Sequence, residues 1–352
     1  MKKYIAAFGA LPNIKGEHWR KLLRYFPDLE SAWSARAGDF LSAGLSEKWI
    51  NSFLEFRAQT EPANVLDLLQ KHKIDIISFD DATYPKLLKE ISNPPYVIYL
   101  RGALLPTDEN AIGIVGSRKG TDYGHRVTFE IAKGLGVAGV TVVSGLALGL
   151  DTEAHRGALA GGGRTIAVLA NGLDSFFPRS NQQLAKQILE NGCIISEQPI
   201  GMPPLRQNFP ARNRIISGIS QGLLVTEAGE NSGTLHTASF AIEQNRQLYA
   251  VPGPIYNPLA KGPNNLLKQG AKAVTCTQDI LEDFGIEENA REILPQGEDE
   301  EMIFEILKVE NLHIDDIARR AERDSADISK ILTLMEIKGK VMHLGGMVYS
   351  LK

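Results

Sequence analysis

The sequence predicts an α/β protein with a doubly wound parallel sheet, a small helical N-terminal domain and a C-terminal winged helix. Three observations support this prediction. Short β-branched runs alternate with amphipathic stretches from about residue 110 to residue 284, helical periodicity fills the first 70 residues, and three short helical stretches precede a Gly-Gly hairpin near the C-terminus. Strand–helix alternation is typical of parallel βαβ units that cover both faces of a sheet. The central domain is therefore expected to be Rossmann-like.

Residues 1–75 are expected to form the helical domain. The stretches WRKLLRYF, SAWSARAGDFLSAG and SEKWINSFLEFRA place apolar residues three and four positions apart, which is the period of an amphipathic helix. A short bridge that holds Pro85, Pro94 and Pro95 follows. The Rossmann-like domain, together with this N-terminal extension, is assigned to residues 76–285.

A polar, acidic segment at residues 286–298 is expected to be a linker, and residues 299–352 are expected to form the winged helix. From Pro295 onward the chain holds 8 Lys or Arg against 12 Asp or Glu. A winged helix that reads DNA is normally basic. The charge therefore favours a regulatory or protein-contact module over a DNA-reading one.

Composition excludes several classes of protein. The 352 residues carry a net charge of −4, so any anion site has to be local rather than a matter of bulk attraction. Two distant cysteines, Cys193 and Cys276, exclude a disulfide framework and a Cys-rich zinc site. The seven histidines show no paired ligand spacing, and no stretch approaches the ~20 apolar residues of a membrane helix. We expect a cytoplasmic protein that needs no metal, cofactor or membrane.

The predicted carboxyl ends of the strands share one character, a glycine or small hydroxyl residue just before a helix. Ligands of a doubly wound sheet bind at this edge. Glycine lets the backbone come close to a ligand, and the following helix presents unpaired N–H groups. Glycines that only make tight turns are the alternative for any single loop, but six such loops favour an anion site. They read GSR at 116–118, SG at 144–145, NG at 171–172, SE at 196–197, EAG at 227–229 and PG at 252–253. Neither GxxxxGK[ST] nor a GxGxxG after the first strand is present, which argues against P-loop and dinucleotide binding.

Positive side chains gather at the same edge. Arg118 and Lys119 lie in the first strand-to-helix loop, and the segment QPIGMPPLRQNFPARNRIISG adds Arg206, Arg212 and Arg214. Phe209 lies among these arginines. Arginine interleaved with an aromatic residue is typical of a single-strand platform, where arginines hold phosphates and the ring stacks a base. Two alternatives stay open: Phe209 plugs its loop onto the sheet, and Arg214 caps a helix.

Six stretches in register from about Ala111 to Val274 carry a family resemblance: GIVGSRKGTDYG, VVSGLALGLDTEAHRGAL, TIAVLANGLDSFFPRSNQQL, IISEQPIGMPPLRQNFPARNRIISG, LVTEAGENSGTLHTASFAIEQNRQLYAVPG and GPNNLLKQGAKAV. On them the sequence resembles the DNA-processing protein A (DprA/Smf) family. The resemblance implies a dimeric protein that binds single-stranded DNA without sequence preference and helps load the RecA recombinase during natural transformation.

The resemblance also implies two sets of site residues. The DNA-binding set is Gly116, Ser117, Arg118, Lys119, Ser144, Gly145, Arg206, Phe209, Arg212, Asn213 and Arg214. The dimer interface, in the last βα unit, includes Asn264, Leu267 and Ala273, although the leucines of this unit could equally belong to the core.

One feature departs from the family pattern. The N-terminal region resembles a helix-hairpin-helix, whose turn usually reads Pro-Gly-x-Gly and offers backbone N–H groups to phosphate. Here the turn reads Pro12-Asn13-Ile14-Lys15, so both glycines are replaced. This hairpin is not expected to bind DNA well.

The rival function is enzymatic. Related Rossmann-like proteins, the nucleoside-monophosphate phosphoribohydrolases, carry PGGxGTxxE with a catalytic glutamate after the Gly-Thr pair. This chain has Gly233-Thr234, but Thr237 stands where the glutamate would be. No other group is evident to stabilise an oxocarbenium-like transition state, since Glu227 and Glu230 precede the pair. Asp151 and Glu153 could be general bases but are better explained as residues that order a loop. We assign no catalytic residue.

Overall fold

The structure is a computed structural model that describes residues 1–12, 14–286, 297–308, 310–338 and 340–351. It divides into two compact units, Met1–Ile286 and Glu287–Lys352, which are described separately. Most of the expected linker, residues 287–296, lies outside the described residues.

A nine-stranded sheet in the order β1-β2-β6-β5-β4-β3-β7-β8-β9 forms the centre of the first unit. The neighbours from β6 to β9 are parallel. The chain winds from β3 outward to β6, returns past β3 to β7 and continues outward to β9. The predicted doubly wound, Rossmann-like sheet is confirmed, and its winding reverses between β3 and β7, where such sheets bind ligands. The parallel strands are β3 (Ala111–Val115), β4 (Thr141–Ser144), β5 (Thr165–Leu169), β6 (Cys193–Ser196), β7 (Gly222–Val225), β8 (Gln247–Ala250) and β9 (Lys272–Ala273).

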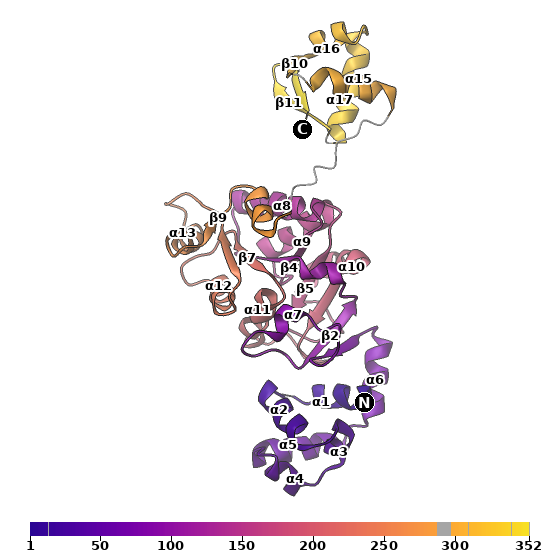
Figure 1. The fold of residues 1–352 in the computed structure, drawn as a ribbon, viewed down its shortest axis with the longest axis vertical. Coiled ribbons are helices and arrows are strands. Elements are labelled where there is room, and N and C mark those ends of the chain that lie inside the picture. The colour runs from indigo at the N-terminus through magenta and orange to yellow at the C-terminus, as the bar shows by residue number, and fades with distance from the viewer. Residues whose placement is uncertain (13, 287–296, 309, 339, 352) are drawn as a thin grey trace. The chain divides into compact units, whose positions relative to one another are not determined.

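Helices cover both faces of this sheet (Figure 1). Along β3, Ile112 and Ile114 belong to one buried cluster, and Ala111 and Val115 belong to another on the opposite face. Because side chains of a strand alternate between faces, a strand covered on both sides reads as a continuous apolar run. The helices are α8 (Asp122–Val137), α9 (Leu150–Ala160), α10 (Gln182–Asn191), α11 (Asn208–Gly218), α12 (Gly233–Glu243), α13 (Lys261–Lys268) and α14 (Gln278–Leu281).

The proline-containing bridge contributes two strands that the sequence pattern did not indicate. β1 (Asp75–Ser78) pairs antiparallel with β2 (Val97–Gly102), and β2 pairs antiparallel with β6 at one end of the parallel sheet. The short helix α7 (Lys86–Lys89) lies between them. The bridge is therefore an extension of the sheet.

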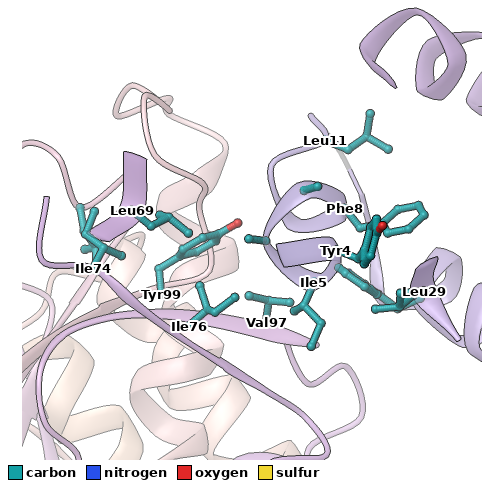
Figure 2. Close-up of a cluster of buried hydrophobic side chains, with 14 of the residues drawn as sticks. Tyr4, Ile5, Phe8, Leu11, Leu29, Leu69, Ile74, Ile76, Val97 and Tyr99 are labelled. Carbon is teal, nitrogen blue, oxygen red and sulfur yellow. The ribbon is translucent and has the colours of Figure 1, made fainter. Parts of the chain in front are cut away.

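The N-terminal region is helical, as predicted, and shares a hydrophobic core with the sheet extension. Figure 2 shows Ile5 and Phe8 of the first helix with Val97 and Tyr99 of β2 in this cluster. Gly9 lies so close to Tyr99 that a Cβ there would meet the tyrosine hydroxyl at 2.7 Å. The helices are α1 (Lys2–Gly9), α2 (Gly16–Tyr25), α3 (Leu29–Ser34), α4 (Ala37–Ser42), α5 (Glu47–Ala58) and α6 (Pro62–Lys71).

The second unit is the predicted winged helix, with three helices and a terminal hairpin around its own core. Ile303, Ile317 and Ile328 are fully buried in that core. Its elements are α15 (Glu298–Leu307), β10 (Leu312–His313), α16 (Ile314–Arg320), α17 (Ser325–Ile337), β11 (Val341–Gly345) and β12 (Val348–Leu351). The strands form a sheet in the order β10-β12-β11. Across the described parts of both units, no helix has the length and apolar character that crossing a bilayer requires.

Candidate nucleic-acid interface

A pocket of about 390 Å³ opens at the carboxyl ends of the central strands, beside the point where the winding reverses. Its walls come from the loop after β3, the loop after β4, the first turns of α11 and the first turn of α12. This is the edge at which the sequence predicted a site. The lining residues are Val115, Gly116, Arg118, Ala147, Asp151, Phe209, Pro210, Arg212, Asn213, Ile216, Ser232, Gly233, Thr234, His236 and Thr237.

The pocket brings together Arg118 and Phe209, which lie 91 positions apart in the chain. Arg118 is exposed, and its guanidinium carbon lies 5.5 Å from the centroid of the half-buried Phe209 ring. A guanidinium on an aromatic face still presents its N–H groups to a phosphate. Lys119 is exposed next to Arg118. Phe177, which the sequence pattern does not single out, makes an edge-on contact with Phe209 at 5.9 Å and is 41% exposed.

Arg212 also lines the pocket, but its guanidinium is engaged within the protein. Its side chain is buried, with 6% of the residue exposed. It donates hydrogen bonds to the carbonyl oxygens of Gly145 and Val168 and to Oδ1 of Asn213. Burial lowers the pKa of Arg212 to about 10, so the group stays charged at neutral pH. Arg212 was predicted to bind a phosphate directly. The structure instead shows it as a buried positive charge in the wall of the pocket.

Arg214 does not lie in the pocket. It is 8% exposed, and its guanidinium forms an ion pair of 2.6 Å with Glu197. It also donates to the carbonyl oxygens of Asn93 and Ala211, at 3.0 and 3.1 Å. These bonds tie α11 to the segment before β2, so the geometry does not support the predicted phosphate contact. Arg206 is exposed on the loop before α11.

The expected backbone floor is not formed by Ser144 and Gly145. The buried Ser144 hydroxyl donates to the Ile114 carbonyl at 2.6 Å, and the Gly145 N–H donates to the Asp151 carboxylate at 3.2 Å. A Cβ on Gly145 would meet the Arg212 guanidinium at 2.5 Å. The glycine here admits a neighbouring side chain rather than a ligand, and the same holds for Gly116.

At Gly116, an added Cβ would lie 2.6 Å from the side chain of Leu150. Ser117 donates its N–H to the carbonyl of Glu227 at 2.8 Å, and its hydroxyl oxygen accepts the N–H of Lys119 at 3.1 Å. The GSR loop is therefore fixed by bonds within the protein, and its side chains, above all Arg118, are what it presents to a ligand.

The loop after β4 supports Arg118 from behind. Gly149 has φ +79°, and a Cβ there would meet the backbone of Ser117 and Arg118 at 2.4–2.7 Å. Asn181 holds the same loop by donating to the Leu146 carbonyl at 2.9 Å. Neither Gly149 nor Asn181 was singled out from the sequence, since nothing in its spacing relates them to the GSR loop.

The first turn of α12 takes the place of the expected floor. Ser232 caps this helix by accepting the N–H of Thr234, and the Thr234 hydroxyl donates to the Gly116 carbonyl. The N-terminus of an α-helix carries a partial positive charge that favours anions. Exposed His236 lies in the same turn. From the sequence, this segment was interpreted as part of the family resemblance and as the Gly-Thr pair of a hydrolase, and it was not included in the predicted DNA-binding set.

The carboxylates near the pocket have structural partners. Buried Glu227 accepts hydrogen bonds from the N–H and hydroxyl of Thr121, which caps α8, at 2.8 and 2.7 Å. Exposed Glu230 lies 3.6 Å from Lys261. Asp151 is buried, and burial raises the pKa of its carboxyl. Within the described ranges no three His, Cys, Asp or Glu side chains cluster as metal ligands do.

The predicted dimer residues differ in exposure. Asn264 faces inward and exchanges hydrogen bonds of 3.0 and 3.2 Å with the backbone of Gly253. Leu267 is half-buried against the core of the sheet, whereas Ala273 is exposed on β9, at the end of the strand order. Asn264 therefore serves the fold, and Ala273 is the member of the set that a second chain could reach.

Two sequence profiles match the chain: DNA recombination-mediator protein A over residues 75–285, and the DprA winged helix domain over residues 287–347. Protein Smf of Synechocystis sp. is 40% identical over 307 residues, which is 85% of this chain and 76% of that protein. DNA processing protein DprA of Bacillus subtilis is 41% identical over 221 residues, covering 62% of this chain and 74% of that protein.

Two solved structures are similar to this chain. The X-ray structure of DNA processing protein A from Streptococcus pneumoniae matches with a TM-score of 0.71 and 33% identity, over 80% of this chain and 98% of that one. DNA processing protein A from Helicobacter pylori, whose structure is described for its single-stranded DNA binding mode, matches with a TM-score of 0.54 and 27% identity, over 60% of this chain and 97% of that one.

Proposed function

Since the chain belongs to the DNA recombination-mediator protein A family, which includes the DprA and Smf proteins, we propose that its α/β domain binds single-stranded DNA without sequence preference. The observation that carries this proposal is the contact between exposed Arg118 and half-buried Phe209 at the pocket mouth. The arginine neutralises a phosphate, and the ring stacks a base of any sequence. The single-stranded DNA binding described for the Helicobacter pylori relative supports the same interpretation.

The proposed contact surface comprises the exposed basic residues of the predicted set, the half-buried Phe209 and Asn213, and one new aromatic. Arg118, Lys119 and Arg206 hold phosphates, Phe209 and Phe177 offer rings, and Asn213 contributes an amide at the wall. Gly116 and Arg212 line the pocket, and Ser117, Ser144 and Gly145 form hydrogen bonds within the protein. Arg214 acts on the surface only through the position of α11.

We further propose that the protein protects incoming single strands in the cytoplasm and passes them to the RecA recombinase during transformation. The family description as a recombination mediator supports this role. We also propose that two copies of the protein associate as a homodimer through the edge strand β9, with Ala273 at the contact. A strand at a sheet edge presents unpaired backbone groups that a second copy can pair.

Two substitutions test the pocket. Arg118→Ala should weaken single-strand binding and reduce the slope of log affinity against log salt by about 0.7 for each phosphate that is no longer neutralised. Phe209→Ala should weaken binding by roughly 1–3 kcal/mol with an unchanged slope, because no charge is removed. Lys186→Ala, which removes an exposed charge from α10 outside the pocket, is the matched control and should behave as the parent protein.

The melting temperatures of these variants show whether a loss of affinity comes from a lost DNA contact or from unfolding. A Phe209→Ala variant that loses affinity only as it unfolds would assign Phe209 to the loop core, and an Arg118→Ala variant with an unaltered slope would remove Arg118 from the interface. Equal affinity of the parent protein for a single strand and a blunt duplex would contradict the proposal. Incubation with a nucleoside monophosphate should release no free base, since Thr237 replaces the hydrolase glutamate; release of base would favour the enzymatic alternative.

A further inference from the structure

A second arginine–aromatic pocket lies between α2 and the sheet extension. It has a volume of about 410 Å³. Its apolar wall is formed by Leu23, Phe79, Pro94 and Tyr96, and Arg20 and Arg24 lie on its rim. These are the two kinds of side chain that also meet at the first pocket.

The aromatic wall is ordered by stacking. Tyr96 stacks on the buried Trp19 at a centroid distance of 4.4 Å, and Phe79 lies nearly parallel to Tyr96 at 6.4 Å. Phe79 and Tyr96 are both half-buried. Lys89 adds a positive charge 5.2 Å from the centroid of the Phe79 ring. Half-buried rings that are held in place by neighbours are suited to stacking a base without a large entropy cost.

The charge at this pocket is available to a ligand. Arg20 and Arg24 are exposed, four positions apart on α2, and neither forms an ion pair with any other described residue. Asp80 is the acidic residue of the lining, and one of its carboxylate oxygens accepts the Tyr96 hydroxyl at 2.7 Å. The rim therefore carries a local excess of positive charge in a chain whose net charge is −4.

A groove runs from this pocket to the start of α11, whose other residues line the first pocket. The groove has a volume of about 690 Å³, shares Gly16, Arg20, Ser92 and Asn93 with the second pocket, and reaches Gln207, Asn208 and Ala211 at the start of α11. The opposite face of the same turns carries Phe209 and Asn213 into the first pocket. Exposed Arg206 precedes α11, so a strand that passes over this helix end meets a positive charge on the way.

We propose that Arg20, Arg24, Phe79 and Tyr96 form a second nucleotide-binding site for the same single strand, which leaves the Arg118 pocket over the first turn of α11 and follows the groove to α2. This inference rests on the proposed function. It assigns the nucleotide contacts to α2 and the sheet extension, while Ile14 and Lys15 of the hairpin turn only line the groove on the way. The arginines hold phosphates, and the aromatic wall stacks a base.

Oligothymidylates of two lengths test the inference, a short one of about eight nucleotides that fills one pocket and a long one of about 30 that can reach both. The Arg20→Ala/Arg24→Ala variant should bind the short oligonucleotide like the parent protein. Its affinity for the long one should fall about tenfold, and the salt slope should fall by up to about 1.4, which is about 0.7 for each phosphate contact. Phe79→Leu should weaken long-oligonucleotide binding about fivefold with the slope unchanged.

Lys48→Ala/Lys71→Ala is the matched control, because it removes two exposed positive charges from the same helical region that line neither the pocket nor the groove. It should leave both affinities unchanged. Because Arg20 and Arg24 are exposed, their double variant should melt like the parent. Parental affinity and slope on the long oligonucleotide, or an equal decrease in affinity for both lengths, would overturn the second site while leaving the proposed function intact. Failure of the proposed function looks different: the parent binds neither oligonucleotide, or Arg118→Ala changes nothing.

Discussion

Arg214 is a residue whose role depends on partners that are distant in the chain. Its guanidinium joins Glu197, 17 positions upstream, and the carbonyl of Asn93, 121 positions upstream. Removing one partner of a largely buried ion pair leaves the other charge poorly solvated. The structure therefore gives Arg214 a part in stability, whereas exposed Arg206, in the same segment, has no such partner among the described residues.

These two arginines give a paired prediction. Arg214→Ala should lower the free energy of unfolding by about 2–3 kcal/mol, less than for a fully buried pair because the Glu197 side chain is 31% exposed. Arg206→Ala should leave stability unchanged and weaken single-strand binding with a smaller salt slope. Urea unfolding and binding titrations on both variants check this. An Arg214→Ala protein as stable as the parent, but with weaker DNA binding, would return Arg214 to the interface.

His155 predicts a pH dependence of stability. The ring is fully buried, its Nδ1 is 2.7 Å from the Thr165 hydroxyl, and burial together with the positive charge of Arg212 lowers the pKa of His155 to about 3. Unfolded histidine binds a proton below about pH 6.5, whereas the folded ring stays neutral down to about pH 3. The contribution of neutral His155 to the free energy of unfolding is therefore complete above about pH 6.5. It is lost, by about 1.4 kcal/mol per pH unit, as the pH falls towards 3.

Urea unfolding at about pH 7, 6 and 5 measures this loss before ordinary carboxylates titrate. The His155→Asn variant lacks the ionisable ring, so its stability should fall less steeply over this range than that of the parent. Asp151, with its raised pKa, works in the opposite direction in both proteins and cancels in the comparison. If the free energy of unfolding falls equally with pH in the two proteins, protonation of His155 does not destabilise the fold.

At the residue scale, the sequence predicted the edge of the sheet at which the pocket opens, but not which of the predicted side chains are accessible there. Arg206, Arg212 and Arg214 look alike in sequence, since no acidic residue lies between Gln198 and Thr226. Burial and carbonyl partners, which come from other strands, separate Arg212 and Arg214 from the rest. Phe177 was missed because its neighbour Phe209 lies in α11, in a distant part of the sequence.

The loop between β4 and α9 is the element that positions the GSR loop. Gly149, just before α9, has the left-handed φ of +79° and lies against the backbone of Ser117 and Arg118. Two separate constraints thus act on this glycine: the sign of φ and the absence of room for a Cβ. Gly139, with φ +77°, has the first constraint but open space around it.

This difference gives the element-scale prediction. Gly139→Ala should cost about 1 kcal/mol, the strain of a left-handed residue with a side chain. Gly149→Ala should cost more, because the GSR loop has to move, and it should also weaken single-strand binding by displacing Arg118. Melting temperature and affinity are measured on both variants. Equal effects of the two substitutions, with binding intact, would show that the loop does not position Arg118.

The elements of the middle domain were predictable because strands covered on both faces and amphipathic helices leave strong periodic patterns. β1 and β2 were not, since Pro85, Pro94 and Pro95 mark the segment between them as irregular. The phosphate floor of Ser144 and Gly145 also failed as a prediction. A glycine at the end of a strand fits both a ligand and a neighbouring side chain, and only packing decides between them.

At the scale of the whole molecule, the first prediction concerns the proposed homodimer. Ala273 is exposed on β9, and Ile255 and Tyr256, on the loop after β8, are 76% and 93% exposed. Ala273→Glu should shift the proposed dimer to monomer by placing a charge at the contact, as light scattering at tens of micromolar would show, about the range of a weak interface. Gln187→Glu adds the same charge on α10, beside β5 and β6 rather than β9, and should leave the dimer intact. A parent protein that is monomeric at this concentration would refute the dimer.

Charge is distributed unevenly along the chain, and the winged helix is acidic. The last prediction concerns the effect of this charge on DNA binding. The segment from Pro295 onward, with 8 basic and 12 acidic residues, has the same net charge of −4 as the entire protein, so the rest of the chain is neutral. Its first-turn acids include Asp315, Asp316 and Asp327, at the starts of α16 and α17. An acidic module repels phosphate, and repulsion between charges weakens as salt screens it.

Truncation after Ile286 removes the acidic unit at the boundary between the two compact units and keeps Ile286, which packs on the core of the first. The truncated protein should bind a single strand as tightly as the full chain or slightly more tightly, and any gain should vanish at high salt. A charge-neutral change, Asp315→Asn/Asp316→Asn/Asp327→Asn in the full chain, should reproduce part of that gain. If truncation instead weakens binding more than tenfold, about 1.4 kcal/mol, then the winged helix contacts DNA despite its charge, and its exposed hairpin would have to be the contact.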